Sequence, residues 1–201
     1  MFDARLRPLI DPPLDALGRL LARAGVGANA VTLAGLLPAV GAGLAIAHHH
    51  YVLALALVLL NRLIDGLDGA VARIRGPSDW GGYLDMVADY VFYLAVPLGF
   101  GFASAANTPA AMVLVASFTL TAVSFLVFAA LAAKHGRMAS EHGTKSFFYS
   151  TGLAEGAETI AVFVAMCLWP AMFVPLAYGF AALCLLTVVQ RTALARRTFR
   201  K

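Results

Sequence analysis

Four aspartates that lie close together in the sequence are the residues best suited to chemistry. They are Asp65, Asp68, Asp85 and Asp89. Residues three or four positions apart share a face of a helix, so the first pair occupies one face and the second pair another. The segment 74–78, which contains Gly and Pro, predicts a turn between two antiparallel helices. The two acidic faces are therefore expected to converge.

The converging carboxylates indicate a metal site. Four carboxylates in one small volume repel one another strongly unless cations lie between them. Oxygen ligands without His or Cys suit hard ions such as Mg²⁺ or Mn²⁺, and Mg²⁺ usually completes its coordination with substrate phosphates. We therefore expect the four aspartates to bind two Mg²⁺ or Mn²⁺ ions that activate a phosphoryl group.

Small residues accompany the aspartates at helical spacing. Gly69 and Ala72 continue the face of the first acidic pair, and Gly81 lies one turn before the second pair. These positions leave room for a ligand against the helix backbone, and Arg73 adds a fixed positive charge suited to a phosphate. Carboxylates solvated at helix ends are the alternative interpretation, but it does not account for four aspartates together with these small residues.

The elements that position these residues are expected to be membrane helices. Of the 201 residues, 61% are hydrophobic and 13% are charged, whereas an ordinary soluble domain has about 45–50% and about 25%. This composition excludes a conventional soluble enzyme, a secreted disulfide scaffold and a disordered chain. Cys167 and Cys184 lie in apolar runs and are interpreted as small core residues. Six apolar stretches are each about as long as a bilayer requires: 29–48, 51–72, 83–104, 110–133, 147–168 and 171–190.

The basic residues give these spans an orientation. They precede the first span, follow the second, separate the fourth from the fifth and close the chain, while the other connections contain no Lys or Arg. One of those uncharged connections holds His48-His49-His50, which we interpret as a polar loop rather than a metal site. The positive-inside rule then places both termini and the four aspartates on the cytoplasmic side. We predict an all-α integral membrane protein that forms a single domain over 1–201, with a six-helix bundle over 29–190.

The segment before the first span is expected to lie on the membrane rather than to cross it. Residues 6–24 mix apolar residues with Arg and Asp, and from Leu14 onward the apolar positions follow helical spacing. This pattern predicts an amphipathic helix on the cytoplasmic leaflet. Pro12 and Pro13 are expected to begin it, because Pro is tolerated in a first helical turn.

The acidic motif is similar to the signature of the CDP-alcohol phosphotransferase family. That signature reads D-x-x-D-G-x-x-A-R, a spacer of seven or eight residues, and G-x-x-x-D-x-x-x-D. Every fixed position matches here with a spacer of seven: Asp65, Asp68, Gly69, Ala72, Arg73, Gly81, Asp85 and Asp89. The resemblance implies a bacterial cell-membrane enzyme that moves the phosphatidyl group from CDP-diacylglycerol to the hydroxyl of a small polar acceptor and releases CMP.

The resemblance also implies a role for each motif residue. The four aspartates match the metal ligands, and Asp89 matches the general base that acts on the acceptor hydroxyl. The nucleotide and its diphosphate are expected to lie against Asp68, Gly69, Ala72, Arg73 and Gly81. Upstream, Asn29 and Thr32 resemble a Pro-Asn-x-x-Thr element of the family, with Ala28 in place of Pro. These two residues are expected to contact the nucleotide or the diphosphate, although Asn29 also suits a helix cap.

Two groups of residues are candidates for binding the acceptor, and they favour different acceptors. The basic residues Lys134, Arg137, Lys145 and Arg191 favour an anionic one. Glu155 and Glu158 favour a neutral polyol or an amino alcohol such as serine, ethanolamine or choline, unless they pair with basic residues inside the bundle. By analogy with small bacterial members, we favour glycerol phosphate or another phosphorylated polyol. Arg62, one turn before Asp65, is interpreted as a partner for a carboxylate.

Other functional classes account for the sequence less well. A divalent-cation transporter would use the same carboxylates, but the outer halves of the spans lack the polar path it would need. A nucleic-acid partner does not suit a chain that is almost entirely membrane helix. The family resemblance implies a homodimer in the membrane. The residues expected at its interface are Tyr90, Tyr93, Gly99, Ser117 and Phe118.

Overall fold

The computed structural model describes residues 3–135 and 156–199, and these residues fold entirely as helices and short connections. This confirms the predicted all-α class, and the helix ends that can be compared with the predicted spans mostly agree within a few residues. The elements are α1 (Asp3–Arg23), α2 (Ala28–Ala47), α3 (Tyr51–Arg75), α4 (Asp79–Ala103), α5 (Thr108–Lys134), α6 (Gly156–Leu168), the 3₁₀ turn η1 (Pro170–Met172) and α7 (Phe173–Phe199).

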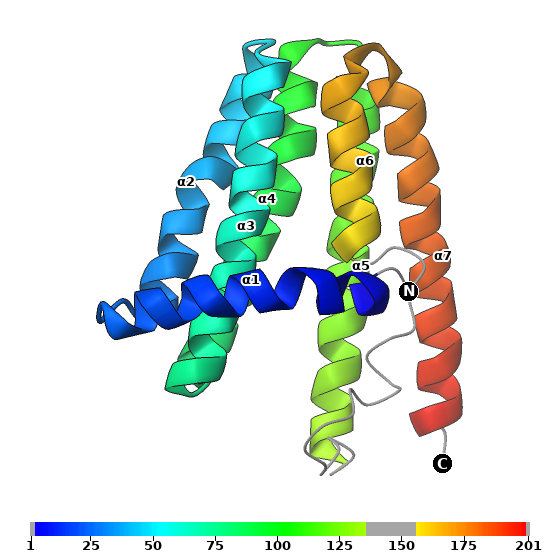
Figure 1. Cartoon of the computed structure of the whole chain (residues 1–201). Helices are drawn as coiled ribbons and strands as arrows, with labels where there is room; N and C mark the ends of the chain where they lie inside the picture. The colour runs from blue at the N-terminus through cyan, green and yellow to red at the C-terminus, as the bar shows by residue number, and fades with distance from the viewer. Residues whose placement is uncertain (1–2, 136–155, 200–201) are drawn as a thin grey trace.

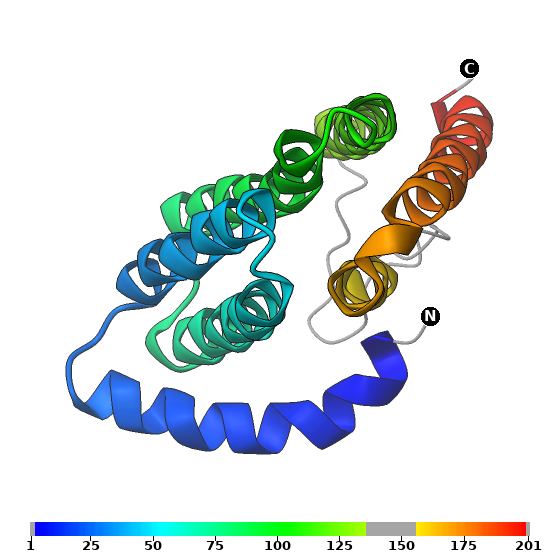
Figure 2. The same cartoon turned by 90° about the horizontal axis from the view of Figure 1, so that it is seen from above.

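Helices α2 to α7 run side by side, alternately up and down, and α1 lies across them near the lower end of the bundle (Figure 1). Seen from above, α2, α3 and α4 form one group, α6 and α7 lie on the opposite side, and α1 runs along one flank (Figure 2). The end of α3 and the starts of α2 and α4 meet at the lower end, close to α1. The acidic residues of α3 and α4 are therefore gathered at one end of the molecule.

Four of the described helices are long and apolar enough to cross a membrane. They are α2, α4, α5 and the continuous helical stretch formed by η1 and α7. Helix α3 is 25 residues long but carries several charges in its second half, among them Arg62 and Asp65. Helix α6 has 13 residues, and the part of its predicted span before Gly156 lies outside the described residues.

Glycines let the helices of this group approach closely. A Cβ on Gly43 of α2 would lie 2.6 Å from the carbonyl oxygen of Ala95, and Gly99 of α4 contacts the backbone of Gly43 in the same way. On the other side of α3, a Cβ on Gly18 of α1 would lie 2.8 Å from Cβ of Ala70. Small residues at such crossings are typical of membrane helix packing, where van der Waals contact drives association. They hold α2, α3 and α4 in the fixed arrangement that the site requires.

The aromatic core corrects the predicted dimer surface. Phe92 and Phe163 meet edge to face, and Phe118 joins them with its ring 6.1 Å from that of Phe163. Phe118, Ser117 and Gly99 are buried inside the protein, so they cannot form a surface for a second copy. These three residues, expected at a dimer interface, lie instead in the interior of the bundle. The two cysteines are free and buried, as predicted.

Helix α1 is longer than the sequence predicts. It begins at Asp3, well before Pro12 and Pro13, so the expectation that these prolines start the helix was wrong. Both prolines are exposed. Proline in a helix interior removes a hydrogen bond and crowds the preceding turn. Helix α1 nevertheless continues through both prolines. The helix ends before Gly25, whose φ of +84° suits glycine.

Candidate active site

The turn between α3 and α4 brings the two acidic helix faces together. Gly76 ends α3 with a φ of +96°, a conformation that glycine adopts without strain. Ser78 caps α4, and its Oγ accepts a hydrogen bond of 3.0 Å from the amide of Gly81. Because of this cap α4 begins at Asp79, four residues before the predicted span. Asp85 and Asp89 therefore both lie within regular helix, on the side of α4 that faces α3.

Three of the four aspartates form a compact group of oxygen ligands. Asp65, Asp68 and Asp85 each offer a carboxylate oxygen, and these oxygens all lie within 4.8 Å of one another. Asp68 is buried, with 6% of its surface exposed. Three acidic oxygens this close repel unless a cation lies between them, and an all-oxygen set suits Mg²⁺ or Mn²⁺. The ligand group thus fits the predicted cofactor.

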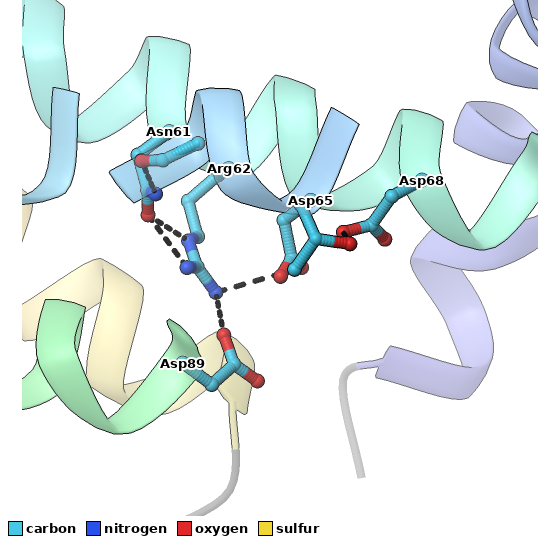
Figure 3. Close-up of polar contacts among 7 residues, drawn as sticks. Asn61, Arg62, Asp65, Asp68 and Asp89 are labelled. Carbon is cyan, nitrogen blue, oxygen red and sulfur yellow. Dashed lines mark hydrogen bonds and ion pairs between the residues drawn. The ribbon is translucent and has the colours of Figure 1, made fainter. Parts of the chain in front are cut away.

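Asp89 has a different partner. Its Oδ1 lies 3.0 Å from Nη1 of Arg62, and the same nitrogen lies 3.5 Å from Oδ2 of Asp65 (Figure 3). The prediction that Arg62 pairs with a carboxylate is confirmed. Arg62 therefore links the fourth aspartate to the edge of the three-carboxylate group.

Thr32 connects α2 to the group of three carboxylates. Its Oγ1 lies 2.7 Å from Oδ2 of Asp68 and 3.1 Å from the carbonyl oxygen of Ala28. A hydroxyl has a single proton to donate, and the shorter contact to a charged oxygen is the stronger hydrogen bond. Thr32 therefore orients Asp68, a role that its position in the nucleotide element did not predict.

A cavity of about 510 Å³ opens beside the carboxylates, between α2, the end of α3 and the start of α4. Of the predicted nucleotide residues, it is lined by Asn29, Thr32, Asp68, Gly69, Ala72 and Gly81. Asn29 lies within α2, whose N-cap residue is Gly27, so the helix-cap interpretation of Asn29 was wrong. Its Oδ1 instead lies beside Gly81, 3.1 Å from where a Cβ would stand. The shape of this cavity depends on glycine at that position.

Sequence reasoning missed one cationic residue of the cavity. Arg75 lines it, whereas Arg73 is not among its lining residues. Arg73 donates to Oδ1 of Asp15 on α1 at 2.7 Å. Helix geometry could have indicated this difference, because a residue seven positions after Asp68 returns to its face and one five positions after it does not.

The predicted acceptor residues fall into two sets. Arg137, Lys145 and Glu155 lie outside the described residues. Lys134 is exposed at the end of α5, and Glu158 lies in the first turn of α6. Arg191 of α7 donates to the carbonyl oxygen of Thr121 at 2.9 Å and to Ser124 at 2.8 Å.

Tyr90, which follows Asp89 in the chain, lies within electrostatic range of both Arg191 and Asp89.

These features match those of a known family of membrane enzymes. The profile of the CDP-alcohol phosphatidyltransferase family matches residues 26–192. The chain therefore belongs to this family and is a CDP-alcohol phosphatidyltransferase, a transferase of phospholipid synthesis, as the motif predicted.

Two relatives are similar in sequence. The inner membrane protein YnjF of Escherichia coli (strain K12) is 45% identical over 192 residues, which cover 95% of this chain and 93% of the relative. The archaetidylinositol phosphate synthase of Pyrococcus horikoshii is 33% identical over 87 residues, which cover 43% of this chain and 46% of the relative. The first similarity supports the prediction of a membrane protein.

Two solved structures of phosphatidylinositol phosphate synthase (PgsA1) from Mycobacterium tuberculosis share the fold. The structure in complex with manganese and citrate has a TM-score of 0.67 at 23% identity and covers 90% of this chain and 88% of its own. The structure with CDP-DAG bound has a TM-score of 0.64 at 21% identity, with coverage of 91% and 93%. A manganese ion in a protein of the same fold agrees with the predicted divalent-cation cofactor.

Proposed function

We propose that this enzyme transfers the phosphatidyl group of CDP-diacylglycerol to the hydroxyl of a small phosphorylated polyol and releases CMP. One observation carries the proposal: a cavity of about 510 Å³ shares Asp68 and Asp85 with the group of three carboxylates. A ligand in the cavity would therefore place its phosphates beside the acidic oxygens. Such an arrangement is typical of sites in which metal ions and substrate phosphates bind together.

The residues of the site divide into binding and reacting groups. Asp65, Asp68 and Asp85 would hold two divalent cations, which would neutralise the diphosphate and the leaving CMP. Asn29, Thr32, Gly69, Ala72 and Gly81 border the cavity for the nucleotide, and Arg75 adds a positive charge there. Arg73, beside Gly69, is proposed to reach the diphosphate from the edge of the cavity.

Asp89 is proposed as the general base. Only one of its oxygens contacts Arg62 at hydrogen-bond distance, which leaves the other for an acceptor. The acceptor oxygen forms a bond to the phosphorus that carries diacylglycerol, the bond from that phosphorus to the CMP oxygen breaks, and the hydroxyl proton passes to Asp89.

The preference for a phosphorylated polyol rests on charge and on one relative. Arg191 lies within electrostatic range of Tyr90, the neighbour of Asp89 in the chain, and would attract an acceptor phosphate. The relative from Pyrococcus horikoshii is named for the synthesis of archaetidylinositol phosphate. Inositol phosphate and glycerol phosphate are therefore the acceptors to test first, with Lys134, Arg137, Lys145, Glu155 and Glu158 as further candidate contacts.

The proposed membrane arrangement has six spans in one domain over 1–201. Helix α3 lies between α1, α2 and α6 and runs antiparallel to α2, as a spanning helix would. The ends of α3, α5 and α7 that carry basic residues point toward the lower end in Figure 1, the end we assign to the cytoplasm together with both termini. Helix α1 would lie on that leaflet. Pairing of two copies is proposed from family resemblance.

The test is release of CMP by the purified enzyme. It would be supplied with CDP-diacylglycerol, Mg²⁺ or Mn²⁺, and a panel of acceptors: inositol phosphate, glycerol 3-phosphate, inositol, glycerol, serine and ethanolamine. We expect release with one of the two phosphorylated polyols and none from Asp89→Asn. Release with serine or ethanolamine alone would overturn the proposed acceptor. Equal rates for Asp89→Asn and the unmodified enzyme would overturn the proposed base.

A further inference from the structure

Arg62 is a cation fixed at the edge of the acidic site. Its Nη1 lies 3.0 Å from Asp89 and 3.5 Å from Asp65, and 13% of its side chain is exposed. The group of oxygens within 4.8 Å of one another includes Asp65 but not Asp89. Three aspartates of the motif thus face one another, whereas Asp89 lies outside that group and is linked to its edge through Arg62, which pairs with both Asp65 and Asp89 (Figure 3).

Three further contacts hold the guanidinium in place. Nε and Nη2 of Arg62 donate to Oδ1 of Asn61 at 2.9 and 2.6 Å (Figure 3). Asn61 is buried, and its Nδ2 donates to the carbonyl oxygen of Gly35 on α2 at 2.9 Å. Cζ of the guanidinium lies 4.0 Å from the centre of the Phe92 ring. A planar guanidinium that is hydrogen-bonded along its edge and packed against an aromatic ring on its face has little freedom to rotate.

A fixed cation in this position has two physical consequences. It repels a divalent cation that enters the neighbouring carboxylates, and it occupies the oxygen of Asp89 that would otherwise turn toward that cation. It also fixes the direction of the second oxygen of Asp89. The repulsion and the loss of an Asp89 ligand weaken cation binding, whereas the fixed second oxygen orients Asp89 to act as a base.

We propose that Arg62 is a positioning residue that keeps Asp89 out of the metal-binding group and directs its free oxygen toward the acceptor, at the expense of affinity for divalent cations. The proposal deepens the function proposed above and rests on it for the role of Asp89. It implies that three aspartates bind the cations and that the fourth is reserved for proton transfer.

The primary test measures Mn²⁺ binding to the full-length protein in detergent, without lipid, by the electron paramagnetic resonance signal of free Mn²⁺. Arg62→Gln should bind Mn²⁺ about tenfold more tightly, because a repelling charge is gone and Asp89 is released. Its kcat for CMP release should fall about 10- to 100-fold, the usual effect of losing a residue that orients another. The KM for CDP-diacylglycerol should change little. If the role of Arg62 were purely structural, Arg62→Gln would instead show both weaker Mn²⁺ binding and slower CMP release.

Three variants serve as controls. Arg62→Lys keeps the charge and should bind Mn²⁺ as the unmodified protein does. Arg19→Gln removes the same charge from an exposed position of α1 and should change neither measurement. In Arg62→Gln combined with Asp89→Asn, Mn²⁺ affinity should return toward that of the unmodified protein, because the released ligand is gone.

A second measurement does not depend on the stability of Arg62→Gln. Asp89→Asn alone should change Mn²⁺ affinity less than about threefold, whereas Asp85→Asn should weaken it by about tenfold or more. Equal losses in these two variants, or weaker binding in folded Arg62→Gln, would overturn the proposal. Mn²⁺ binding by the unmodified protein without CMP release from any acceptor would instead overturn the proposed function and leave the comparison of affinities intact.

Discussion

Arg73 of α3 donates to Asp15 of α1 across a distance of 2.7 Å. This ion pair joins the crossing helix to the helix that carries two of the four aspartates. The two side chains are 52% and 37% exposed, so the pair stabilises the fold by about 1 kcal/mol at most. Nη1 of Arg73 lies 3.5 Å from where a Cβ on Gly69 would stand, at the edge of the cavity. The pair therefore holds Arg73 beside the cavity but turned toward α1.

Removing the partner of Arg73 should release it for the substrate. In Asp15→Asn the carboxylate that competes with the substrate diphosphate for the Arg73 guanidinium is gone. The KM for CDP-diacylglycerol should therefore fall by about two- to fivefold, the equivalent of about 1 kcal/mol or less. The kcat and the melting temperature should stay nearly unchanged. Steady-state CMP release checks this, with Asp11→Asn on the same helix as the matched control. A higher KM in Asp15→Asn would mean that α1 must hold Arg73 for binding.

The two arginines at the end of α3 should differ in their effect on the nucleotide. Arg75 lines the cavity and also donates to the carbonyl oxygen of Gly25 at 3.1 Å. Because a hydrogen bond to a charged group contributes about 1.5–3 kcal/mol, Arg75→Gln should raise the KM for CDP-diacylglycerol by about 10- to 100-fold. Arg73→Gln should raise it less. The inhibition constant of CMP, measured in competition with CDP-diacylglycerol, reports the same contact of Arg75 with the nucleotide. A larger rise in KM in Arg73→Gln than in Arg75→Gln would contradict the assignment of Arg75 to the nucleotide cavity.

The sequence predicted the helices and the motif well because both depend on local spacing. Apolar stretches of membrane length identified α2, α4 and α5 to within about four residues. Convergence of the aspartates of α3 and α4 followed from a short turn and helical periodicity. What failed were expectations that depend on contacts between distant segments. Ser117 and Phe118 seemed suited to a partner surface, but sequence does not reveal which side of an apolar helix meets the rest of the bundle.

Two features of the site illustrate the same limit. Arg73 was assigned to the diphosphate from motif position, but a carboxylate from α1 competes for it, and α1 is connected to α3 only through the fold. The pairing of Arg62 with a carboxylate was predicted, but not that Asp89 would be separated from the other three aspartates. That division depends on Phe92 of α4, which lies against Arg62, and on Asn61, which is anchored to Gly35 of α2; both contacts between helices form only once the helices have packed.

Thr32 should matter through the carboxylate it contacts. Thr32→Val keeps the shape of the side chain but removes the donor to buried Asp68, which then loses its orientation within the ligand group. We expect kcat/KM to fall by about 10- to 100-fold and the Mn²⁺ concentration for half-maximal rate to rise. Thr32→Ser retains the hydroxyl and should keep most of the activity. Comparable losses in both variants would point to packing rather than to the hydrogen bond.

Gly69 should be required for binding of the nucleotide and not for folding of the protein. A Cβ there would meet only the end of the Arg73 side chain, at an ordinary contact distance of 3.5 Å, so Gly69→Ala should fold and keep its melting temperature. The added methyl would instead project into the cavity that Gly69 lines, where a nucleotide would lie against the helix backbone. We expect the KM for CDP-diacylglycerol to rise by about tenfold or more, since overpacking typically costs 1–3 kcal/mol.

The matched control is Gly179→Ala on α7. That glycine is also helical, and it is exposed, with no atom within 4 Å of an added Cβ, but it does not line the cavity. Its activity should match that of the unmodified enzyme, because alanine is the better helix former and meets no neighbour. Thermal unfolding measured beside CMP release separates the two effects. If Gly69→Ala retained its KM while Gly81→Ala, on the α4 side of the same cavity, lost activity, the nucleotide would have to lie on the α4 side.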